Sequence, residues 1–563
     1  MRPADTILLV FYFVLMVGVG VYFARYMKNV GVYFVGGKKL PWWLGGVSFL
    51  MSYVSALSIV MYTAMGYTYG LVSMTLYAAS VPACLLTSEL FARRWHRAGI
   101  STPVEFLERR FSAGLRQVFA WSGIPLKVID EGLKIIAVGV FVSTGLGVSL
   151  NAAIVLTGAI IVVYTTLGGL WAVFITDFIQ FVLVTVAVVL LLPLSLQRTG
   201  GMASFVARAP EGFFHPLHAP YGGFYVVGFV LLVTLSIAGN WSLIQRFYAS
   251  RSETDARRVG WLATALFIVL PPIWIFAGMA ARVWLPADWA KHHDPQYVYA
   301  EISRLLLPPG LLGLVVAALF AATMSVLSAG YNVIASVLTV DVYQRLIRPD
   351  ASQRRLVTVG KGLTVVVGAC AMLVAWIVIY LKWTLFDTMV AAFGFFLPPT
   401  VLPVLAGLLW PRVTSRGALA GFIAGIVTGA AFLVVKPFLP AAYGPSLQTV
   451  SLWFSSVVVV VAMAVGSNAD ERERARIAEF YDSLERPAPP SEVADVPEPF
   501  LISGVVLLLL GIVLAVIGWL TGTPSVLASA TGLLLAVLGG LLLARHWRTV
   551  AKSEKTGAAG EVP

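Results

Sequence analysis

Long apolar stretches alternate with short polar connections along almost the whole chain. A helix needs about 20 apolar residues to cross the roughly 30 Å of hydrocarbon in a bilayer. Fifteen stretches come close to or exceed that length, and the pattern predicts a polytopic, all-α membrane protein. The predicted spans are 5–24, 42–70, 71–92, 115–147, 150–167, 171–195, 222–244, 259–285, 308–342, 357–381, 385–410, 417–438, 447–466, 500–520 and 525–544.

The lysines and arginines in the connections predict how these spans are oriented, because basic residues concentrate on the cytoplasmic side of a membrane. With the N-terminus outside, 29 of the 39 basic residues fall in inward connections and 8 in outward ones. We therefore expect a multi-pass protein of the cell (inner) membrane, with its C-terminus in the cytoplasm. The N-terminus lacks a strongly basic leader and a small-residue cleavage site, so the first span is expected to be retained.

Composition agrees with this topology. The chain is 59% hydrophobic and 12% charged, whereas a soluble protein carries about a quarter charged residues. The net charge of +12 follows from the basic inward connections, so no nucleic-acid partner is expected. Cys84 and Cys370 lie in apolar runs, which predicts helix packing and neither a disulfide framework nor a metal cluster.

The longest polar stretch lies between the predicted spans 447–466 and 500–520. It reads as a short amphipathic helix followed by a proline-rich linker, and it is too short to hold a soluble catalytic domain. The six histidines all lie in loops or at the ends of spans. An enzyme is therefore not expected.

Serines crowd the middle of the predicted span 42–70, at Ser48, Ser52, Ser55 and Ser58. A helix that unwinds at mid-membrane uses such residues, because its freed carbonyl groups need new partners. A continuous helix that packs through small residues has the same composition. Both interpretations stay open at this point.

Residues 127–134, KVIDEGLK, place four charges at about mid-depth in the predicted span 115–147. At about 100° per residue, Lys127, Asp130, Glu131 and Lys134 share one helix face and form two i,i+4 pairs. An unpaired charge at the bilayer centre costs about 3 kcal/mol or more, so this face is expected to turn inward. It is either a self-neutralising ladder that braces the helix, or a site for an anionic substrate, a proton or a second cation.

The stretch YTTLGGLWAVFITDFIQ, residues 164–180, combines a helix break at Gly168 and Gly169 with Asp177 and Gln180 in the next span. It resembles the signature of the sodium:solute symporter family. Four further stretches resemble that family in the expected order, and together they extend the resemblance over roughly 8–465. They are GGKKLPWWLGGVSFLMSYVSALS, GNWSLIQRFYASRSETDARR, GLVVAALFAATMSVLSAGYNVIASVLTVDVY and GLLWPRVTSRGALAGFIAG.

The resemblance implies a secondary active transporter that moves a small organic solute into the cell with a cation, by alternating access. It implies two inverted five-helix repeats, with ion and solute held near the midplane at broken helices. Protein partners are not predicted. The expected division is 1–41 for an N-terminal helix and loop, 42–195 and 196–410 for the repeats, 411–466 for two accessory helices, 467–499 for a cytoplasmic linker, 500–545 for a helical hairpin and 546–563 for a tail.

The resemblance also implies where the coupling ion binds. It assigns Na+ to the carbonyl groups of Met51, Val54 and Ala322 and to a hydroxyl pair at positions 325 and 326. Ser325 has the first hydroxyl, but Val326 lacks the second. This departure leaves open weak sodium binding, a water in the gap, or coupling to H+ in place of Na+. No organic cofactor is expected.

The predicted span 42–70 also contains the evidence on the solute. Sugar-transporting members of the family have Glu-Gln after the Ser-Ala of this helix, whereas Leu57-Ser58 follows Ser55-Ala56 here. The pattern resembles the branch that moves monocarboxylates, vitamins and iodide, so a small monocarboxylate is the expected solute. Proline, nucleosides and urea stay open, as does a solute sensor built on the same fold. The candidate pocket residues are Ser55, Ser58, Tyr62, Tyr77 and Ser80.

Overall fold

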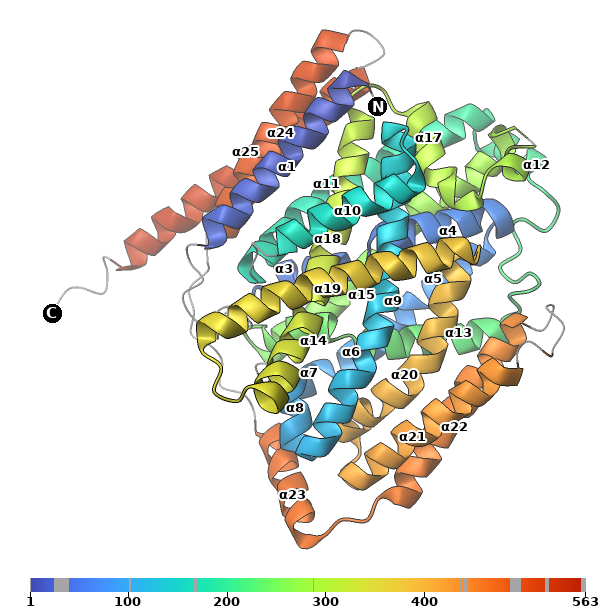
Figure 1. The fold of residues 1–563 in the computed structure, drawn as a ribbon. Helices are drawn as coiled ribbons and strands as arrows, with labels where there is room; N and C mark the ends of the chain where they lie inside the picture. Colours follow the sequence, from blue (N-terminus) through green and yellow to red (C-terminus); the bar gives the residue numbers. More distant parts are fainter. Residues whose placement is uncertain are drawn as a thin grey trace.

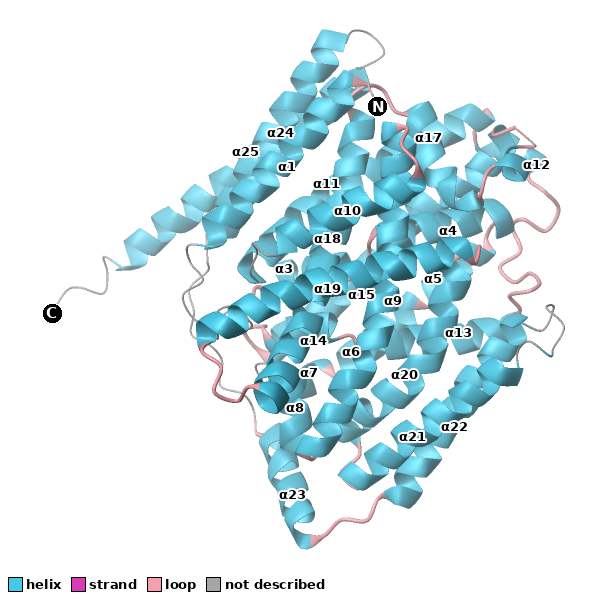
Figure 2. Cartoon of the chain, in the orientation of Figure 1, coloured by secondary structure: helices cyan, strands magenta, loops and turns pink. Residues whose placement is uncertain are grey.

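The computed structural model is built almost entirely of helices (Figures 1 and 2). No strand occurs in the part of the chain that the structure describes. The described residues are 2–24, 40–100, 103–165, 170–286, 288–435, 438, 444–486, 498–521 and 526–557.

Most helices follow the apolar stretches of the sequence. Up to residue 199 they are α1 (Pro3–Ala24), α3 (Trp42–Met51), α4 (Ala56–Tyr69), α5 (Val72–Ala78), α6 (Ser80–Leu90), α9 (Ala113–Leu146), α10 (Leu150–Thr165) and α11 (Leu170–Thr199). From residue 223 they are α13 (Gly223–Gly239), α14 (Trp241–Tyr248), α15 (Glu253–Trp284), α18 (Leu311–Val337), the π-helix η3 (Leu338–Ile347), α19 (Gln353–Tyr380), α20 (Leu385–Leu409), α21 (Ser415–Val435), α22 (Gly444–Gly466), α24 (Glu498–Thr521) and α25 (Val526–Gly557).

The remaining helices lie in the connections. They are α7 (Ala92–Arg97), α8 (Pro103–Arg110), α12 (Met202–Arg208), α16 (Trp289–His292), the 3-10 helix η2 (Pro295–Tyr297), α17 (Val298–Leu306) and α23 (Glu471–Glu485). The helix α23 is the amphipathic helix expected in the long polar stretch, and its apolar residues Ile477, Phe480 and Leu484 are buried.

The prediction of an all-α polytopic membrane protein is confirmed. Among the described residues, nine helices are long and apolar enough to cross a membrane, and three bent helix pairs raise the count to as many as twelve. The figure of fifteen crossings stays a prediction. Two of the bent pairs are α3 with α4, at 59°, and α13 with α14, at 55°.

The helix α18 lies at the centre of the molecule. Within its apolar stretch 94% of the residues are buried, whereas the other eight candidate spans reach at most 56%. It packs against α1, α9, α10, α11 and α19. Small residues allow this close approach: a Cβ atom added at Gly313 would clash with the backbone of Asp5, and one at Gly330 would clash with the Glu131 carboxylate.

The helices α24 and α25 form a hairpin at one side of the molecule, and α1 runs beside it (Figure 1). Glycines bring the two helices of the hairpin into backbone contact, because a Cβ atom at Gly511 or Gly532 would clash with the facing main chain. The helix α1 also contacts α18, and Asp5 accepts hydrogen bonds from the amides of Gly310 and Gly313 at 2.7 and 3.1 Å. These bonds satisfy donors that a helix N-terminus leaves unpaired.

The helix α23 is tied to the end of α20. The Tyr481 hydroxyl donates a hydrogen bond to the carbonyl of Gly407 at 2.9 Å, and the buried guanidinium of Arg110 donates to the same carbonyl at 2.9 Å and to that of Val413 at 2.7 Å. Burial lowers the pKa of Arg110 and raises that of Tyr481. The bonds to Gly407 satisfy a carbonyl group that the last turn of α20 leaves unpaired, and the bond to Val413 ties Arg110 to the connection that follows α20.

Candidate ion and solute site

The helix that begins at Trp42 is interrupted at the serine-rich stretch. α3 ends at Met51, α4 begins at Ala56, and the backbone of Ser55 is extended (φ −132°, ψ 176°). In a continuous helix the amides of Ser55 and Ala56 would bond the carbonyls of Met51 and Ser52. Instead, the Ser55 amide donates to Ser58 Oγ at 3.1 Å and the Ala56 amide donates to Thr323 Oγ1 at 2.9 Å. Of the two interpretations of this stretch, the unwound helix is confirmed.

The interruption lies against the central helix α18. Thr323 is fully buried, and its hydroxyl donates to the Leu319 carbonyl at 2.9 Å while accepting from Ala56. Its neighbour Ala322 is also buried, as are Met51 and Val54 on the other segment. The fold therefore brings together the two segments to which the family resemblance assigns the coupling ion.

The predicted hydroxyl pair is described only in part. Val326 is half-buried on α18 and offers no side-chain oxygen. The Ser325 side chain lies outside the described part of the structure. The assignment of Met51, Val54, Ala322, Ser325 and the position of Val326 to the ion stays a prediction.

The five candidate pocket residues Ser55, Ser58, Tyr62, Tyr77 and Ser80 are all buried. The Ser58 hydroxyl donates to the Ser55 carbonyl at 2.8 Å. The rings of Tyr62 and Tyr77 meet edge to face, with centroids 4.6 Å apart. Tyr77 and Tyr53, which belongs to the interruption itself, both contact the ring of Phe267, at 6.4 and 5.4 Å between centroids. The five residues thus lie around the break, although their role in solute binding stays a prediction.

Aromatic side chains from later helices surround Tyr62 and Tyr77. The sequence alone did not predict these additional aromatic residues as part of the site. Phe386 at the start of α20 lies 6.2 Å from Tyr62 between ring centroids and stacks on Phe229 of α13 at 5.7 Å. Tyr77 contacts Trp274 of α15 at 5.8 Å. Each of these residues is an ordinary apolar residue in its own span, so only the fold reveals the cluster.

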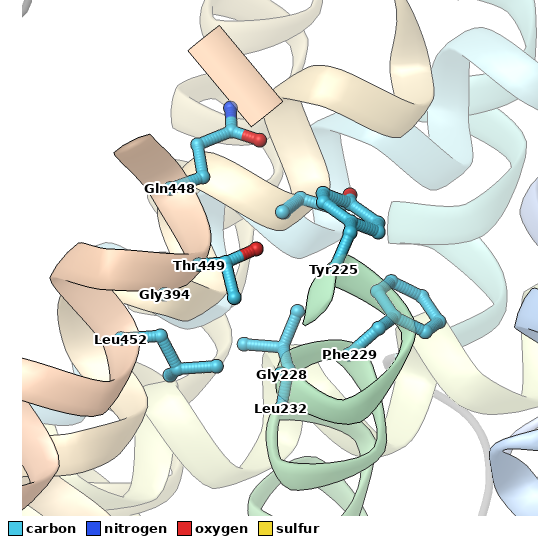
Figure 3. Close-up of a pocket in the computed structure, with 9 residues that line it drawn as sticks. Tyr225, Gly228, Phe229, Leu232, Gly394, Gln448, Thr449 and Leu452 are labelled. Carbon is cyan, nitrogen blue, oxygen red and sulfur yellow. The ribbon is translucent and has the colours of Figure 1, made fainter. Parts of the chain in front are cut away.

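A separate cavity opens between α13, α20 and α22 (Figure 3), with about 240 Å³ of empty space that includes open solvent. In Figure 3 its wall combines Tyr225 and Phe229 of α13 with Gln448, Thr449 and Leu452 of α22. It shares Phe229 with the aromatic cluster. No residue predicted for ion or solute lines it.

The signature acid Asp177 of α11 lies in a buried polar cluster with two other helices. The Ser48 hydroxyl of α3 donates to Asp177 Oδ2 at 2.5 Å, and Arg246 of α14 lies 3.5 Å from the same oxygen. Arg246 Nε also donates to Ser48 Oγ at 3.1 Å. This cluster ties the first half of the broken helix to α11 and α14.

Of the other signature residues, the structure describes only Gln180. Gln180 is buried on α11, one turn beyond Asp177. Gly168 and Gly169 lie outside the described residues. The functional role of the whole signature stays a prediction.

The charged face of α9 turns into the protein. This is expected, because charged side chains that face the hydrocarbon of a bilayer cost free energy. Lys134 Nζ lies 2.7 Å from Asp130 and 3.5 Å from Glu131, and both Glu131 and Lys134 are buried. The expected ion pair between Lys127 and Glu131 does not form among the described side chains, and Lys127 is half-buried. Lys134 takes both carboxylates because it extends along α9 between them, at i,i+4 and i,i+3.

These features define a class of protein: multi-pass membrane transporters in which interrupted helices meet inside a helical core. The comparison with known families names the group. The chain belongs to the sodium:solute symporter family, whose model matches residues 33–425. Members of this family are sodium-coupled transporters and not enzymes.

Curated relatives are similar along most of the chain. The sodium/glucose cotransporter of Vibrio parahaemolyticus is 28% identical over 500 residues, which cover 83% of this chain and 91% of that one. The sodium/myo-inositol cotransporter 2 of Rattus norvegicus is 27% identical over 487 residues, which cover 77% of this chain and 70% of that one.

Solved structures share the fold. A sodium-coupled sialic acid symporter, in a substrate-bound outward-open state, matches with a TM-score of 0.67 at 22% identity, over 81% of this chain and 98% of that one. A nucleobase-cation-symport-1 family transporter in a closed conformation matches with a TM-score of 0.51 at 14% identity, over 80% of this chain and 99% of that one.

Proposed function

We propose that the protein moves a small organic solute into the cell together with Na+, by alternating access around the junction of α3, α4 and α18. The observation that carries the proposal is the hydrogen bond from the Ala56 amide to Thr323 Oγ1. It holds the broken helix against the central helix, so that movement of either segment changes the junction where the ion would bind.

The carbonyl groups of Met51, Val54 and Ala322 and the Ser325 hydroxyl form the proposed sodium site. Diversion of the Ser55 and Ala56 amides supports this, because carbonyl groups freed deep in a membrane need a partner, and a cation is one. Val326 brings no hydroxyl. We therefore expect weaker Na+ binding than at a site with two hydroxyls, and H+ is the alternative coupling ion.

The proposed repeats are 42–195 and 196–410, flanked by 1–41, by the accessory helices of 411–466, by the linker 467–499, by the hairpin 500–545 and by the tail 546–563. The two bent pairs support this division, since α3–α4 and α13–α14 each stand at the start of a repeat. Interrupted helices at matching places in two halves are typical of inverted-repeat transporters.

The chain would lie in the cell membrane with its N-terminus outside and its C-terminus in the cytoplasm. In Figure 1, α1, α24 and α25 run side by side, and the N-terminus lies at the opposite end of this group from the end of α25.

For the solute we propose a neutral, hydroxyl-rich molecule of monosaccharide or cyclitol size. The named solutes of two relatives are glucose and myo-inositol. Buried serine hydroxyls beside the Tyr62–Tyr77 pair suit such a molecule, because hydroxyls exchange hydrogen bonds and rings cover its C–H faces. Lys134 is engaged by two carboxylates, which weakens the expectation that it binds an anionic solute.

A small monocarboxylate is the second candidate. Leu57-Ser58 stands where sugar-transporting members have Glu-Gln, and Lys127 forms no ion pair with Glu131 among the described side chains. A carboxylate could therefore pair with Lys127.

Uptake into proteoliposomes tests the proposal. The panel contains labelled glucose, galactose, myo-inositol, pyruvate, acetate and lactate, each under a sodium-only and a proton-only gradient. We expect a sodium gradient to drive uptake of glucose, galactose or myo-inositol. Uptake of the carboxylates alone would select the second candidate, and uptake that ignores sodium would contradict the proposed coupling.

The matched variants are Thr323→Val and Thr364→Val. Both lose a buried threonine hydroxyl, but among the described residues the Thr364 hydroxyl bonds the carbonyl of Gly360 alone, in its own helix, at 2.9 Å. We expect Thr323→Val to lose most sodium-driven uptake and Thr364→Val to retain it.

A further inference from the structure

A buried carboxyl group lies between α9 and the central helix. Glu131 is 0% exposed, and its Oε1 atom lies directly over Gly330 of α18, where any larger side chain would clash. Gly330 is four residues beyond Val326, which is about one helical turn or 6 Å along α18. Glu131 therefore lies one turn from the position where the predicted sodium site lacks a hydroxyl.

The charge around Glu131 is not balanced by the nearest ammonium. Lys134 is shared, at 2.7 Å from Asp130 and 3.5 Å from Glu131. Glu131 Oε1 accepts no hydrogen bond from the described residues. Two carboxylates with one close ammonium would leave a negative charge buried inside the membrane, which is costly.

Of the other groups around Glu131, Lys127 opposes this charge, but no ion pair among the described side chains brings its ammonium within 4 Å of the carboxylate. The titratable groups that act on it are Lys127, Asp130 and Lys134 of its own helix and Tyr331 of α18. The other elements that pack on α9 are α4, α8, α10, α17, α19, α20, α21 and η2, and no described group on them acts on Glu131. Lys127 is half-buried and forms no ion pair with Glu131.

A proton fits this place better than a second metal cation. Sodium needs several oxygen ligands, whereas Glu131 has the main chain of α18 against Oε1 and the Lys134 ammonium 3.5 Å from Oε2. Asp130, the other carboxylate, is already held by Lys134. A proton needs no extra space, and a neutral carboxyl group is far cheaper to bury than a carboxylate.

We propose that Glu131 is a proton-binding site, which is protonated while α9 packs against Gly330 and releases its proton to water when the two helices separate. Only one O–H bond forms and breaks in this step, and water supplies and accepts the proton. Where it concerns transport, the proposal rests on the proposed function: solute entry is linked to H+ at Glu131 in addition to Na+ at the broken helix.

Infrared spectroscopy of the protein in lipid nanodiscs tests protonation without any need for transport. The carbonyl stretch of a buried, protonated carboxyl group is recorded across a pH series. We expect a band in the wild-type protein that Glu131→Gln removes and Asp130→Asn retains. A spectrum that Glu131→Gln leaves unchanged would overturn the proposal.

Uptake at a fixed, saturating Na+ gradient tests the link to transport. We expect acidification of the outside alone to raise solute accumulation several-fold in the wild-type protein. Glu131→Gln, which mimics the neutral side chain, should transport with no response to the pH gradient, and Glu131→Asp should regain part of it. Glu301→Gln, which alters an exposed pair with Arg304, is the control and should respond as the wild type does.

The two readouts separate the possible failures. If the wild-type protein takes up no solute under any sodium gradient, the proposed function fails, while the infrared band still decides whether Glu131 binds a proton. If uptake is sodium-driven and Glu131→Gln keeps the full response to pH, the link to transport at Glu131 is wrong. Should Glu131→Gln not fold, Glu131→Asp must shift the infrared band, and an unmoved band would overturn the assignment.

Discussion

The backbone amide of Ala56, the first residue of α4, donates a hydrogen bond of 2.9 Å to the side-chain hydroxyl of Thr323 in the middle of α18. The two residues are 267 positions apart in the chain. Through this bond the broken helix takes its missing acceptor from α18, the most buried of the nine candidate membrane spans among the described residues. The bond gives the predicted ion site a physical basis, because it fixes the interrupted helix against the continuous helix α18.

Loss of the Thr323 hydroxyl is expected to weaken the junction. Thr323→Val leaves the buried Ala56 amide without an acceptor, which costs about 1–3 kcal/mol. We expect a lower melting temperature in detergent and a higher Na+ concentration for half-maximal uptake. Thr323→Ser keeps the hydroxyl and should stay close to wild type. If valine and serine behave alike, the hydrogen bond does not support the site.

Addition of a hydroxyl at position 326 is expected to strengthen sodium dependence. Val326→Ser restores the second hydroxyl of the predicted pair, and we expect the apparent affinity for Na+ to rise by up to about tenfold, or about 1.4 kcal/mol. The measurement is solute uptake as a function of Na+ concentration. No change in that curve would count against the assignment of residue 326 to the ion site.

The contact between α9 and α18 predicts a steric effect at Gly330. Gly330→Ala places a methyl group against Glu131 Oε1, and overpacking of this kind costs about 1–3 kcal/mol. The double variant with Glu131→Ala should recover part of the loss in thermal unfolding. Gly362→Ala in α19 is the control, since a Cβ atom there meets nothing within 4 Å. Equal losses in the two glycine variants would contradict this packing.

The buried cluster of Ser48, Asp177 and Arg246 predicts a large effect of removing one charge. Asp177→Asn removes the carboxylate charge that lies 3.5 Å from the Arg246 guanidinium, and loss of one partner of a buried ion pair costs about 3–5 kcal/mol. We expect a sharp fall in the yield of folded protein and in its melting temperature. The exposed pair of Glu301 and Arg304 offers the comparison, because loss of a surface pair costs about 1 kcal/mol or less. Similar effects at both sites would show that the buried cluster is not structural.

Local patterns in the sequence predict much of this architecture. Apolar length predicts the helices, and the serines around Ser52 indicate the interruption, since freed carbonyls inside a membrane need polar neighbours. The helical spacing of Lys127, Asp130, Glu131 and Lys134 shows that their face must turn inward, and burial of Glu131 and Lys134 confirms it.

The rest depends on contacts between distant segments. A threonine such as Thr323, which bonds the carbonyl four residues back, looks like an ordinary helix residue, so nothing local marks it as the partner of Ala56. The Ser48–Arg246 bond joins residues 198 positions apart. Helical spacing allows Glu131 to form an ion pair with either Lys127 or Lys134. The packing of the side chains selects Lys134, which lies 3.5 Å away.

The most direct test of the ion site is a structure of the protein in lipid nanodiscs, determined by cryo-electron microscopy in Na+ and again in choline. The account predicts a density in Na+ alone, within coordination distance of the Met51, Val54 and Ala322 carbonyls and the Ser325 hydroxyl. The same density should be absent from Thr323→Val. A sodium ion bound elsewhere, with nothing between α18 and the break after Met51, would contradict the account.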